Sequence, residues 1–597
     1  MNWWVQRLGH RVDAVTAVAA VVLVIGAAQL VAGALAAGVT VDEPTHVDRA
    51  TGWLENGWYT EDGAAPDPDN PLETGYVYGP AWAALAHGAN VLAGNESLGE
   101  ISRSAGAYDV RHLTVAALAL LTVAAVGAAV WRLTSSRGFG LWAAAGLLAI
   151  PAWTGHAFFN PKDIPAACGY ALVSLALILA LCEGPSRRAS SSYRLTLGAI
   201  LAGGIFIGAG TRLALWLPFA ASLVTYAALR LGQRRLGGIA LDAHTDLAVA
   251  AGAGAGFAAI AVLYPTAASE PVTLLTESVS GSSDFPHTTV TLTAGHLLSE
   301  HVPWWYLPIW IGASVPLLLG ALALLGAVLG IRALATVRGT CRHGAIWSRP
   351  KLGLLLVFQQ ALLLPLGAIV TGAPAYHGTR QHLYVLPAIA ILAGVGAERF
   401  WRWAKARRAQ KRWRALAVSV LGAALLVPMA EQTLLFPYNY AYVNPAAGIG
   451  GVNDRWETDY LFASAPEALS RTPRTSSLRC GYWLGLPWID DRPLQERHYW
   501  LSLTKLVPCI DDDALAPFEA RWGDAVAERW QDDNSAVWLI GRKRAGNRPP
   551  DYCEEADTVT RWLRGESVVM SYVFRCDPAE ARRNGVRWPR GLPIAPD

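Results

Sequence analysis

The sequence is short of charge for its length. Only 16% of its 597 residues are Asp, Glu, Lys or Arg, whereas 53% are hydrophobic. A water-facing surface of this size needs more charged residues than that. The composition therefore excludes an ordinary soluble domain and favours a polytopic membrane protein.

Neither sign of charge is in clear excess. The chain has 49 basic and 46 acidic residues, a formal net charge of +3. This balance argues against a nucleic-acid-binding protein, whose phosphate contacts require a strongly basic surface. Any affinity for phosphate must therefore come from a few local residues.

Cysteine is scarce, and no CxxC motif occurs, which argues against a zinc or redox site in the C-terminal tail. Cys168, Cys182 and Cys341 fall in apolar runs or a predicted cytoplasmic loop, where a reduced thiol is expected. The other four, in an exported tail, suggest two disulfides, with three connectivities left open. They are Cys480, Cys509, Cys553 and Cys576.

Long apolar runs are abundant, and a run of about 20 residues crosses a bilayer. Cleavage of a signal peptide near residues 34–36 is an alternative for the first run, but its apolar core is longer than the usual 7–15 residues. Eleven spans are predicted, at 14–40, 113–133, 138–157, 164–182, 195–210, 213–230, 245–264, 304–330, 352–370, 383–398 and 414–430.

Basic residues give the orientation of these spans. With a cytoplasmic N-terminus, the inner segments hold 23 Lys or Arg residues and the outer segments only six. The basic run 399–414 then contacts anionic lipid on the cytoplasmic side, an explanation we prefer to nucleic-acid binding. We expect a multi-pass protein of the plasma or inner membrane whose tail lies outside.

The chain divides into two predicted domains. Residues 1–430 form a transmembrane domain with a long first outer loop, 41–112, and residues 431–597 form an exported α/β domain. The tail contains strand-like runs at 477–483, 536–541 and 568–574, between more helical stretches. The tail has no internal repeat and no low-complexity linker precedes it, so we expect it to pack on the membrane domain.

An acidic pair opens the first outer loop. Asp42 and Glu43 precede Pro44, and the spacing predicts a short surface helix that closes at Gly57. Helix capping is one explanation for the two carboxylates; catalysis is the other. A second helix, from Pro80 to Ala93, is too short to span and is expected to lie in the membrane interface.

Two further outer segments carry reactive side chains. The third span ends in HAFFNPKDIP, which places His156, Lys162 and Asp163 on the same face as Asp42, although Asp163 could simply cap the next helix. The loop TGAPAYHGTRQHLY adds Tyr376, His377, Arg380 and His382. Arg380 could bind a phosphate through its planar guanidinium or reach lipid phosphate from the interface.

The aromatic run PWWYLP contains Trp304, Trp305 and Tyr306. It fits an interfacial aromatic belt or a wall on which a sugar stacks. A divalent cation is possible near Asp42, Glu43, His46 and Asp163, because carboxylate and imidazole groups are metal ligands. Their spacing matches no metal-binding signature.

These motifs resemble, in order, those of the GT-C class of membrane glycosyltransferases. The resemblance is to the phospholipid-carrier-dependent, family 39-like branch, which includes protein O-mannosyltransferases and the lipid A aminoarabinose transferase. It covers residues 41–465 and includes PYNYAYVNPAAGIGG and WETDY. Tyr78-Gly79-Pro80 stands where relatives often have His-Pro-Pro, and Leu461 where many have Trp. The WWD signature of oligosaccharyltransferases is absent, because Tyr306 follows the two tryptophans.

The resemblance implies a cell-envelope enzyme that moves a hexose or pentose from a polyprenyl-phosphate donor to a protein, lipid or polysaccharide acceptor outside the membrane. It implies that Asp42 is the catalytic base and that Asp163 is the second acidic residue, with Glu43 beside the base. Arg380 and Lys162 would hold the donor phosphate. Donor or acceptor would contact the remaining predicted site residues: His46, Tyr376, His377, His382, Trp304, Trp305 and Tyr306.

Two other functions remain open. A transporter or flippase of lipid-linked sugars would also have many spans, but such proteins usually place charges at mid-membrane and show two related halves. The exported tail could instead be a binding module anchored by the spans, although eleven spans are excessive for an anchor. The sequence favours the transferase because its candidate charges lie at the outer rim.

Overall fold

The computed structural model describes most of the helical region and part of the tail. The described residues are 14–40, 42–66, 75–182, 190–235, 242–285, 291–298, 302–339, 349–407, 410–471, 479–482, 537–542 and 553–576. Cys341 and Cys509 lie outside these ranges.

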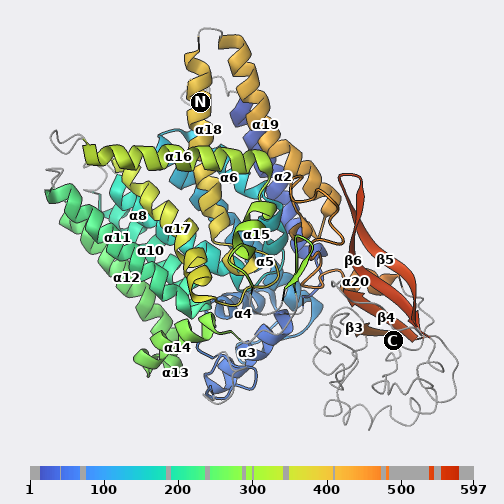
Figure 1. The fold of residues 1–597 in the computed structure, drawn as a ribbon. Coiled ribbons are helices and arrows are strands. Elements are labelled where there is room, and N and C mark those ends of the chain that lie inside the picture. Colours follow the sequence, from blue (N-terminus) through green and yellow to red (C-terminus); the bar gives the residue numbers. More distant parts are fainter. Residues whose placement is uncertain are drawn as a thin grey trace, which may run out of the picture.

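Nine helices in this part of the chain are long and apolar enough to cross a membrane. They form one bundle (Figure 1). Most coincide with the apolar runs predicted from the sequence. The nine are α2 (Ala14–Ala36), α5 (Ala105–Thr134), α8 (Asp163–Cys182), α10 (Ser191–Thr211), α11 (Trp216–Arg235, preceded by η1, Leu213–Leu215), α12 (Ala243–Leu263), α16 (Leu317–Gly339), α17 (Arg349–Thr371) and α19 (Gln410–Leu435).

The predicted total of eleven spans is not confirmed. Helices α6 (Arg137–Leu148) and α7 (Pro151–Ala157) form a pair bent by 69°, which makes ten if the pair is one span. The predicted span 304–330 is two helices, α15 (Tyr306–Ser314) and α16. Both breaks precede a proline, which forces the residue before it, Ile150 or Val315, into an extended conformation.

Helix α18 (Val385–Ala406) covers the predicted span 383–398 but is not among the nine. Glu398, Arg399 and Arg402 lie in its second half, where Glu398 pairs with both arginines. The helix nevertheless packs closely on α16. Gly326 and Gly396 permit this approach, because a Cβ on either residue would meet the backbone of the other helix.

Helix α8 occupies the middle of the bundle. Most of its side chains are buried, and it contacts α5, α10 and α17. Its first residue is Asp163, so the most enclosed helix of the bundle begins at a predicted site residue. This burial fixes the position of the preceding turn, residues 160–162.

The short elements gather at one end of the bundle, opposite the end where α2 begins (Figure 1). We call this end the site face. It carries α3 (Glu43–Asn56), α4 (Ala81–Ala93), α13 (Pro265–Ala268) and α14 (Pro271–Ser283). The predicted helix after Asp42 is confirmed, with Pro44 in its first turn and Gly57 at its end in the left-handed conformation, φ 85°. The predicted helix up to Ala93 is confirmed as α4.

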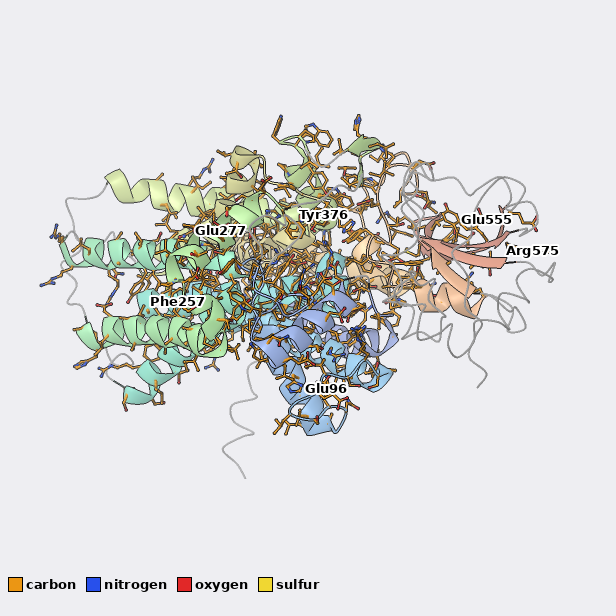
Figure 2. The ribbon with its side chains drawn as sticks, turned by 90° about the horizontal axis from the view of Figure 1, so that it is seen from below. Glu96, Phe257, Glu277, Tyr376, Glu555 and Arg575 are labelled. Atoms are coloured by element: carbon orange, nitrogen blue, oxygen red, sulfur yellow. The ribbon has the colours of Figure 1, made fainter. Side chains whose placement is uncertain are left out.

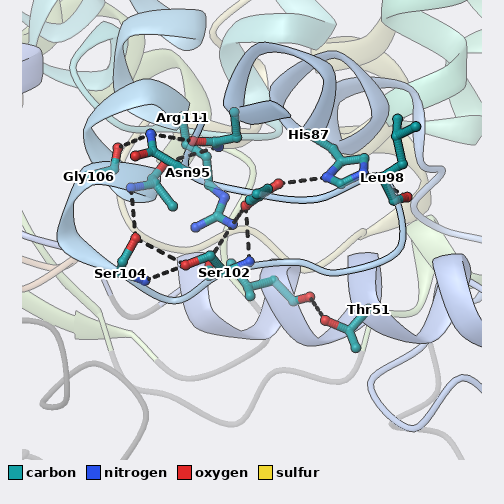
Figure 3. A network of polar contacts seen from close by, with 12 residues as sticks. Thr51, His87, Asn95, Leu98, Ser102, Ser104, Gly106 and Arg111 are labelled. Carbon is teal, nitrogen blue, oxygen red and sulfur yellow. Dashed lines mark hydrogen bonds and ion pairs between the residues drawn. The ribbon is translucent and has the colours of Figure 1, made fainter. Parts of the chain in front are cut away.

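A hydrogen-bonded network fastens α4 to the start of α5 (Figure 3). Glu96 accepts from Arg111 and from the Ser102 amide, 3.2 Å away, and lies 2.6 Å from His87 Nδ1. Asn95 donates to Asn90 of α4 and to the Gly106 carbonyl of α5, at 3.1 Å each. The part of the first loop from α4 to the start of α5 is therefore an ordered part of the site face.

The tail contributes a four-stranded sheet in the order β3-β4-β6-β5. The strands are β3 (Arg479–Tyr482), β4 (Val537–Arg542), β5 (Cys553–Leu563) and β6 (Glu566–Cys576). The three predicted strands are confirmed as β3, β4 and β6. The sequence missed β5, because this edge strand has no apolar run and carries several charged residues. The backbone register places Cys553 opposite Cys576.

A second, two-stranded sheet lies in the loop after α14. Strands β1 (Thr291–Thr293) and β2 (His296–Leu298) pair antiparallel. Thr293 bridges to Trp456, so this hairpin joins the loop to the segment that precedes the tail sheet.

Candidate functional site

Three segments far apart in the sequence meet at Asp42. Lys162 Nζ lies 2.9 Å from Asp42 Oδ2, and an Arg380 guanidinium nitrogen contacts the same oxygen. Both basic side chains are buried, whereas the Asp42 side chain keeps 21% of its exposure. The structure thus brings together the predicted acid and both predicted phosphate-binding cations.

Asp42 stands at the start of α3, but it does not cap that helix. It occupies the N-cap position without a side-chain cap hydrogen bond. The carboxylate is directed instead to Lys162 and Arg380, which belong to other elements. The capping explanation therefore does not account for Asp42.

The two cations determine the ionisation of Asp42. Burial alone would raise the pKa of this carboxyl, but Arg380 and then Lys162 outweigh burial and hold the pKa well below its usual value. Asp42 is consequently an anion across the physiological pH range while both cations remain in place. Drawing the cations away would raise its pKa and make it a better proton acceptor.

Asp163 forms a second ion pair beside the first. Its Oδ1 contacts Arg212, and its Oδ2 accepts a hydrogen bond of 2.9 Å from Asn160 Nδ2. The side-chain oxygen of Asn160, Oδ1, accepts hydrogen bonds from the backbone amides of Lys162, at 3.2 Å, and Asp163, at 2.9 Å. The 160–163 turn therefore fixes a lysine and an aspartate with one asparagine side chain.

Tyr78 is the aromatic centre of the site. Arg49, Lys162 and Arg212 place their cationic groups 5.1, 5.3 and 5.5 Å from the centre of its ring. Burial raises the pKa of the Tyr78 phenol, but these three cations reverse that effect and lower the pKa below its ordinary value. Tyr78 also forms a β-bridge with Arg212. We call Asp42, Lys162, Asp163, Arg212, Arg380 and Tyr78 the ion-pair cluster.

The segment that carries Arg380 is tightly turned. His377 and Gly378 both have positive φ, 55° and 69°, and the Gly378 amide donates to the Tyr306 hydroxyl at 3.1 Å. Tyr376 packs under Arg380, whose guanidinium carbon lies 5.0 Å from the ring centre. The turn therefore brings Tyr376, which precedes it, next to Arg380, the first residue of η2 (Arg380–His382).

Tyr376 lies near the centre of the site face (Figure 2). In this view Phe257 and Glu277 lie on one side of it, and Glu555 and Arg575 of the tail sheet lie on the other. In this view Tyr376 therefore lies between residues of α12 and α14 and residues of the tail sheet.

Two predicted histidines line the cluster in their neutral form. Burial, Lys162 and Arg49 lower the pKa of His46, whose Nδ1 lies 3.2 Å from the Tyr59 hydroxyl and whose ring meets Tyr78 edge-on. Burial, reinforced by Arg212, lowers the pKa of His382 to about 4. Neutral imidazoles do not add to the positive charge of the site.

Glu43 points away from Asp42. Its carboxylate accepts from the Thr40 amide at 2.7 Å and the Thr40 hydroxyl at 2.9 Å, and lies 2.7 Å from His112 Nε2. These bonds tie the junction of α2 and α3 to α5. Glu43 thereby fixes the start of the helix from which Asp42 projects.

The predicted tryptophans are not brought to the cluster. Trp304 is 70% exposed, and Trp305 packs against His296 of β2. Tyr306 is buried and reaches the site only through its hydrogen bond to Gly378. The position of Trp304 fits the interfacial alternative that the sequence left open.

No group of three or more His, Cys, Asp or Glu residues suitable for a metal occurs in the described part of the chain. Asp42 and Asp163 are paired with cations, and Glu43 is bonded to Thr40 and His112. The donor set considered in the sequence, which also includes His46, therefore does not form a cation cage among these residues.

Sequence reasoning missed four residues that support the site: Arg49, Tyr78, Asn160 and Arg212. Tyr78 was noted only as a departure from related sequences. One signal was present, because basic residues are rare in the predicted outer loops. Each basic residue there was therefore a candidate for a specific partner.

Comparisons with known proteins give structural similarities only. No protein-family model matches the chain, and no curated protein matches it. The chain is similar to ArnT from Cupriavidus metallidurans in the apo state, with 15% identity, a TM-score of 0.43, and coverage of 94% of this chain and 98% of that one. The same protein bound to undecaprenyl phosphate gives 15% identity, a TM-score of 0.42 and the same coverage.

An archaeal oligosaccharyltransferase gives a similar result. AglB from Archaeoglobus fulgidus, in complex with an inhibitory peptide and a dolichol-phosphate, has 12% identity and a TM-score of 0.43. The match covers 88% of this chain and 69% of that chain. At these values similarity by itself assigns no function to the chain.

Proposed function

We propose that this chain is a membrane glycosyltransferase that moves a sugar from a polyprenyl-phosphate donor to an acceptor on the extracytoplasmic side. The observation that carries the proposal is the contact of one carboxylate, Asp42, with two buried cations, Lys162 and Arg380, at one end of an apolar bundle. This arrangement offers an acid–base group and a phosphate-binding pair beside lipid.

In the proposed reaction the acceptor hydroxyl attacks the anomeric carbon of the donor sugar. The new bond forms as the bond from that carbon to the phosphate oxygen breaks, and the electron pair leaves on the phosphate. Asp42 takes the hydroxyl proton, a step worth typically 10²–10⁴-fold. A single displacement of this kind inverts the configuration of the sugar.

Lys162 and Arg380 serve the leaving phosphate. Charge-assisted hydrogen bonds to its oxygens stabilise the developing negative charge. When the two cations bind the phosphate instead of Asp42, they no longer lower the pKa of Asp42, and this pKa rises. Donor binding would thus prepare the base, which couples the two halves of the site.

The remaining predicted site residues take supporting roles in this proposal. Asp163 orients Arg212, and the bonds of Glu43 support a positioning role behind Asp42. Tyr376, His46, His377 and His382 border the reacting groups, and Tyr306 supports the turn before Arg380 through Gly378. Trp304 and Trp305 lie at the membrane interface at the edge of the site face.

We infer that the site face is extracytoplasmic and that the protein lies in the plasma or inner membrane with a cytoplasmic N-terminus. The excess of basic residues in the loops at the other end supports this orientation. The division into a transmembrane region, 1–430, and an exported region, 431–597, is part of the same proposal.

The test replaces Asp42 by Asn and assays transfer from labelled polyprenyl-phosphate hexoses and pentoses in membranes that contain the protein. We expect transfer to fall by at least ~100-fold, the typical contribution of a general base. Asp48→Asn, on the same helix, is the control, because Asp48 pairs with the half-exposed Arg103. Undiminished transfer by the Asp42 variant would remove it as the base.

The same assay separates a transferase from a flippase. A transferase consumes the donor and releases polyprenyl phosphate, whereas a flippase moves the donor across the membrane unchanged. Intact donor on the opposite side of sealed vesicles, with no product, would favour the transporter.

A further inference from the structure

The β5–β6 hairpin of the tail is hydrogen-bonded to the segment 452–464. Glu566 accepts from the amides of Val452, at 2.8 Å, and Asn453, at 3.1 Å. The Val569 amide donates to Asn453 Oδ1 at 2.9 Å, and the Val569 carbonyl accepts from the Thr458 hydroxyl at 2.5 Å. The hairpin therefore sets the path of this segment. Figure 1 shows the β5–β6 hairpin beside α19 and α20 (Ala465–Ser470).

The segment contains a buried carboxylate, Asp459. This group accepts from the amides of Ala463 and Ser464, each at 3.0 Å, and from the hydroxyls of Ser464 and Tyr440. The Ser464 hydroxyl oxygen also lies 2.7 Å from that of Ser571 in β6. Asp459 is thus fixed both by its own turn and by the hairpin, and so is the residue after it, Tyr460.

Tyr460 carries the connection into the membrane domain. Its hydroxyl lies 2.9 Å from His156 Nε2, and its ring is stacked on His377 at 5.4 Å with an interplanar angle of 12°. His156 Nδ1 lies 3.1 Å from Asn160 Nδ2. Since the Asn160 oxygen accepts two backbone amides, its nitrogen is the donor to His156, which then carries its proton on Nε2.

The connection ends on the ion-pair cluster. Asn160 Nδ2 also donates to Asp163, and Asn160 Oδ1 holds the amides of Lys162 and Asp163. Buried networks of this kind are rigid when every member is satisfied. The network runs from Ser571 through Ser464, Asp459, Tyr460, His156 and Asn160 to Lys162 and Asp163.

We propose that the C-terminal hairpin positions the active site through this network, with Tyr460, His156 and Asn160 as positioning residues. The inference rests on the proposed function, because it assigns Lys162 to the donor phosphate. The tail is then part of the catalytic machinery, and its contribution is distinct from acceptor binding. Because Tyr460 is stacked on His377, the hairpin also positions the turn that carries Arg380.

The test uses the full-length protein and two mild variants at opposite ends of the network. Tyr460→Phe removes only the hydroxyl that contacts His156, and Ser571→Ala removes only the hydroxyl that contacts Ser464. We expect Tyr460→Phe to lower kcat by ~10-fold or more, since small displacements of catalytic groups have effects of this size. The KM for a soluble acceptor analogue should stay unchanged, and the half-saturating donor concentration should rise with the displacement of Lys162.

The double variant distinguishes positioning from independent structural damage. Distant residues normally act independently, so that their effects on kcat multiply. If both hydroxyls act through one network, the double variant should be no worse than Tyr460→Phe alone. Tyr572→Phe, on the same strand as Ser571 and outside the network, is the control and should match the parent protein.

The outcomes are separable from those of the proposed function. Unchanged kcat in Tyr460→Phe, or multiplied effects in the double variant, would overturn the positioning role while Asp42→Asn remained inactive. Full activity of Asp42→Asn would instead overturn the proposed base, whatever the network variants do. A fall in thermal unfolding temperature with kcat unchanged per folded protein would make the network purely structural and would also overturn the inference.

Discussion

Lys162 Nζ lies 2.9 Å from Asp42 Oδ2, the oxygen that Arg380 also contacts. One carboxylate oxygen therefore contacts two buried cations, which come from the 160–163 turn and from η2. An incoming phosphate that binds both cations would compete with Asp42 for their N–H donors. The pair thus links the binding of an anion to the release of a base.

Lys162 should be needed for the donor phosphate. Lys162→Met keeps the length of the side chain and removes its charge, so we expect polyprenyl phosphate to bind at least ~10-fold more weakly, the equivalent of one charged hydrogen bond. Binding to the purified protein in nanodiscs measures the effect. Lys405→Met is the control, because Lys405 is exposed and packs on Trp401. Equal binding by both variants would exclude Lys162 from the phosphate site.

Arg380 should tolerate lysine better than alanine. Lysine retains a charge near Asp42 but lacks the planar fork of five donors, so we expect donor binding in the order wild type, Arg380→Lys, Arg380→Ala. Titration of transfer activity with donor gives the three half-saturating concentrations. Equal values in the three proteins would contradict a phosphate contact.

Arg212 and Asp163 should depend on one another for stability. Arg212→Gln leaves the almost fully buried Asp163 carboxylate without its cation, which is expected to cost ~3–5 kcal/mol. Adding Asp163→Asn removes the stranded charge and should restore part of the loss. Thermal unfolding of the single and double variants measures the coupling. A double variant less stable than both single ones would show that the two side chains do not act as a pair.

The stability of the site face should fall in mild acid. Burial and Arg212 lower the pKa of His382 from 6.5 to about 4, so the unfolded state binds a proton between these values and the folded state does not. The contribution of His382 to the free energy of unfolding is therefore fully present above pH 6.5. It is lost progressively as the pH falls toward 4, by ~3 kcal/mol. His382→Gln should flatten the pH dependence of the unfolding temperature over that window. An unchanged dependence would show that His382 is not buried in its neutral form.

Gly57 should be required for the geometry of α3. It ends the helix at φ 85°, and a Cβ there would lie 2.9 Å from Thr266 Cγ2. We expect Gly57→Ala to lower the free energy of unfolding by ~1 kcal/mol or more, because alanine is strained at positive φ. Gly88→Ala is the matched control: Gly88 lies within α4, where a Cβ meets no atom within 4 Å. The control should be neutral or stabilising.

Local patterns in the sequence determined much of the fold. The apolar runs predicted most of the long helices, Pro44 and Gly57 predicted the limits of α3, and strand-like runs predicted β3, β4 and β6. These features depend on residues close together in the chain. The breaks before Pro151 and Pro316 are local too, but long apolar runs concealed them.

The sequence also named Asp42, Lys162, Asp163 and Arg380, but it could not say which of them touch. Arg380 lies 338 positions from Asp42, and their contact depends on how α3, α8 and η2 are packed. For the same reason the sequence placed Glu43 with the catalytic acids, placed the two tryptophans near the sugar, and missed Arg212 and Tyr78.

Residue types and local periodicity thus determined that the chain is a helical membrane protein with a reactive rim and a β-containing tail. Only the tertiary structure decided that one aspartate holds two cations, that Arg212 pairs with Asp163, and that the tail reaches the 160–163 turn. The physical reason is that span formation follows from the burial of apolar side chains within one segment. An ion pair forms only where separate segments, brought together by packing, place opposite charges within a few ångströms.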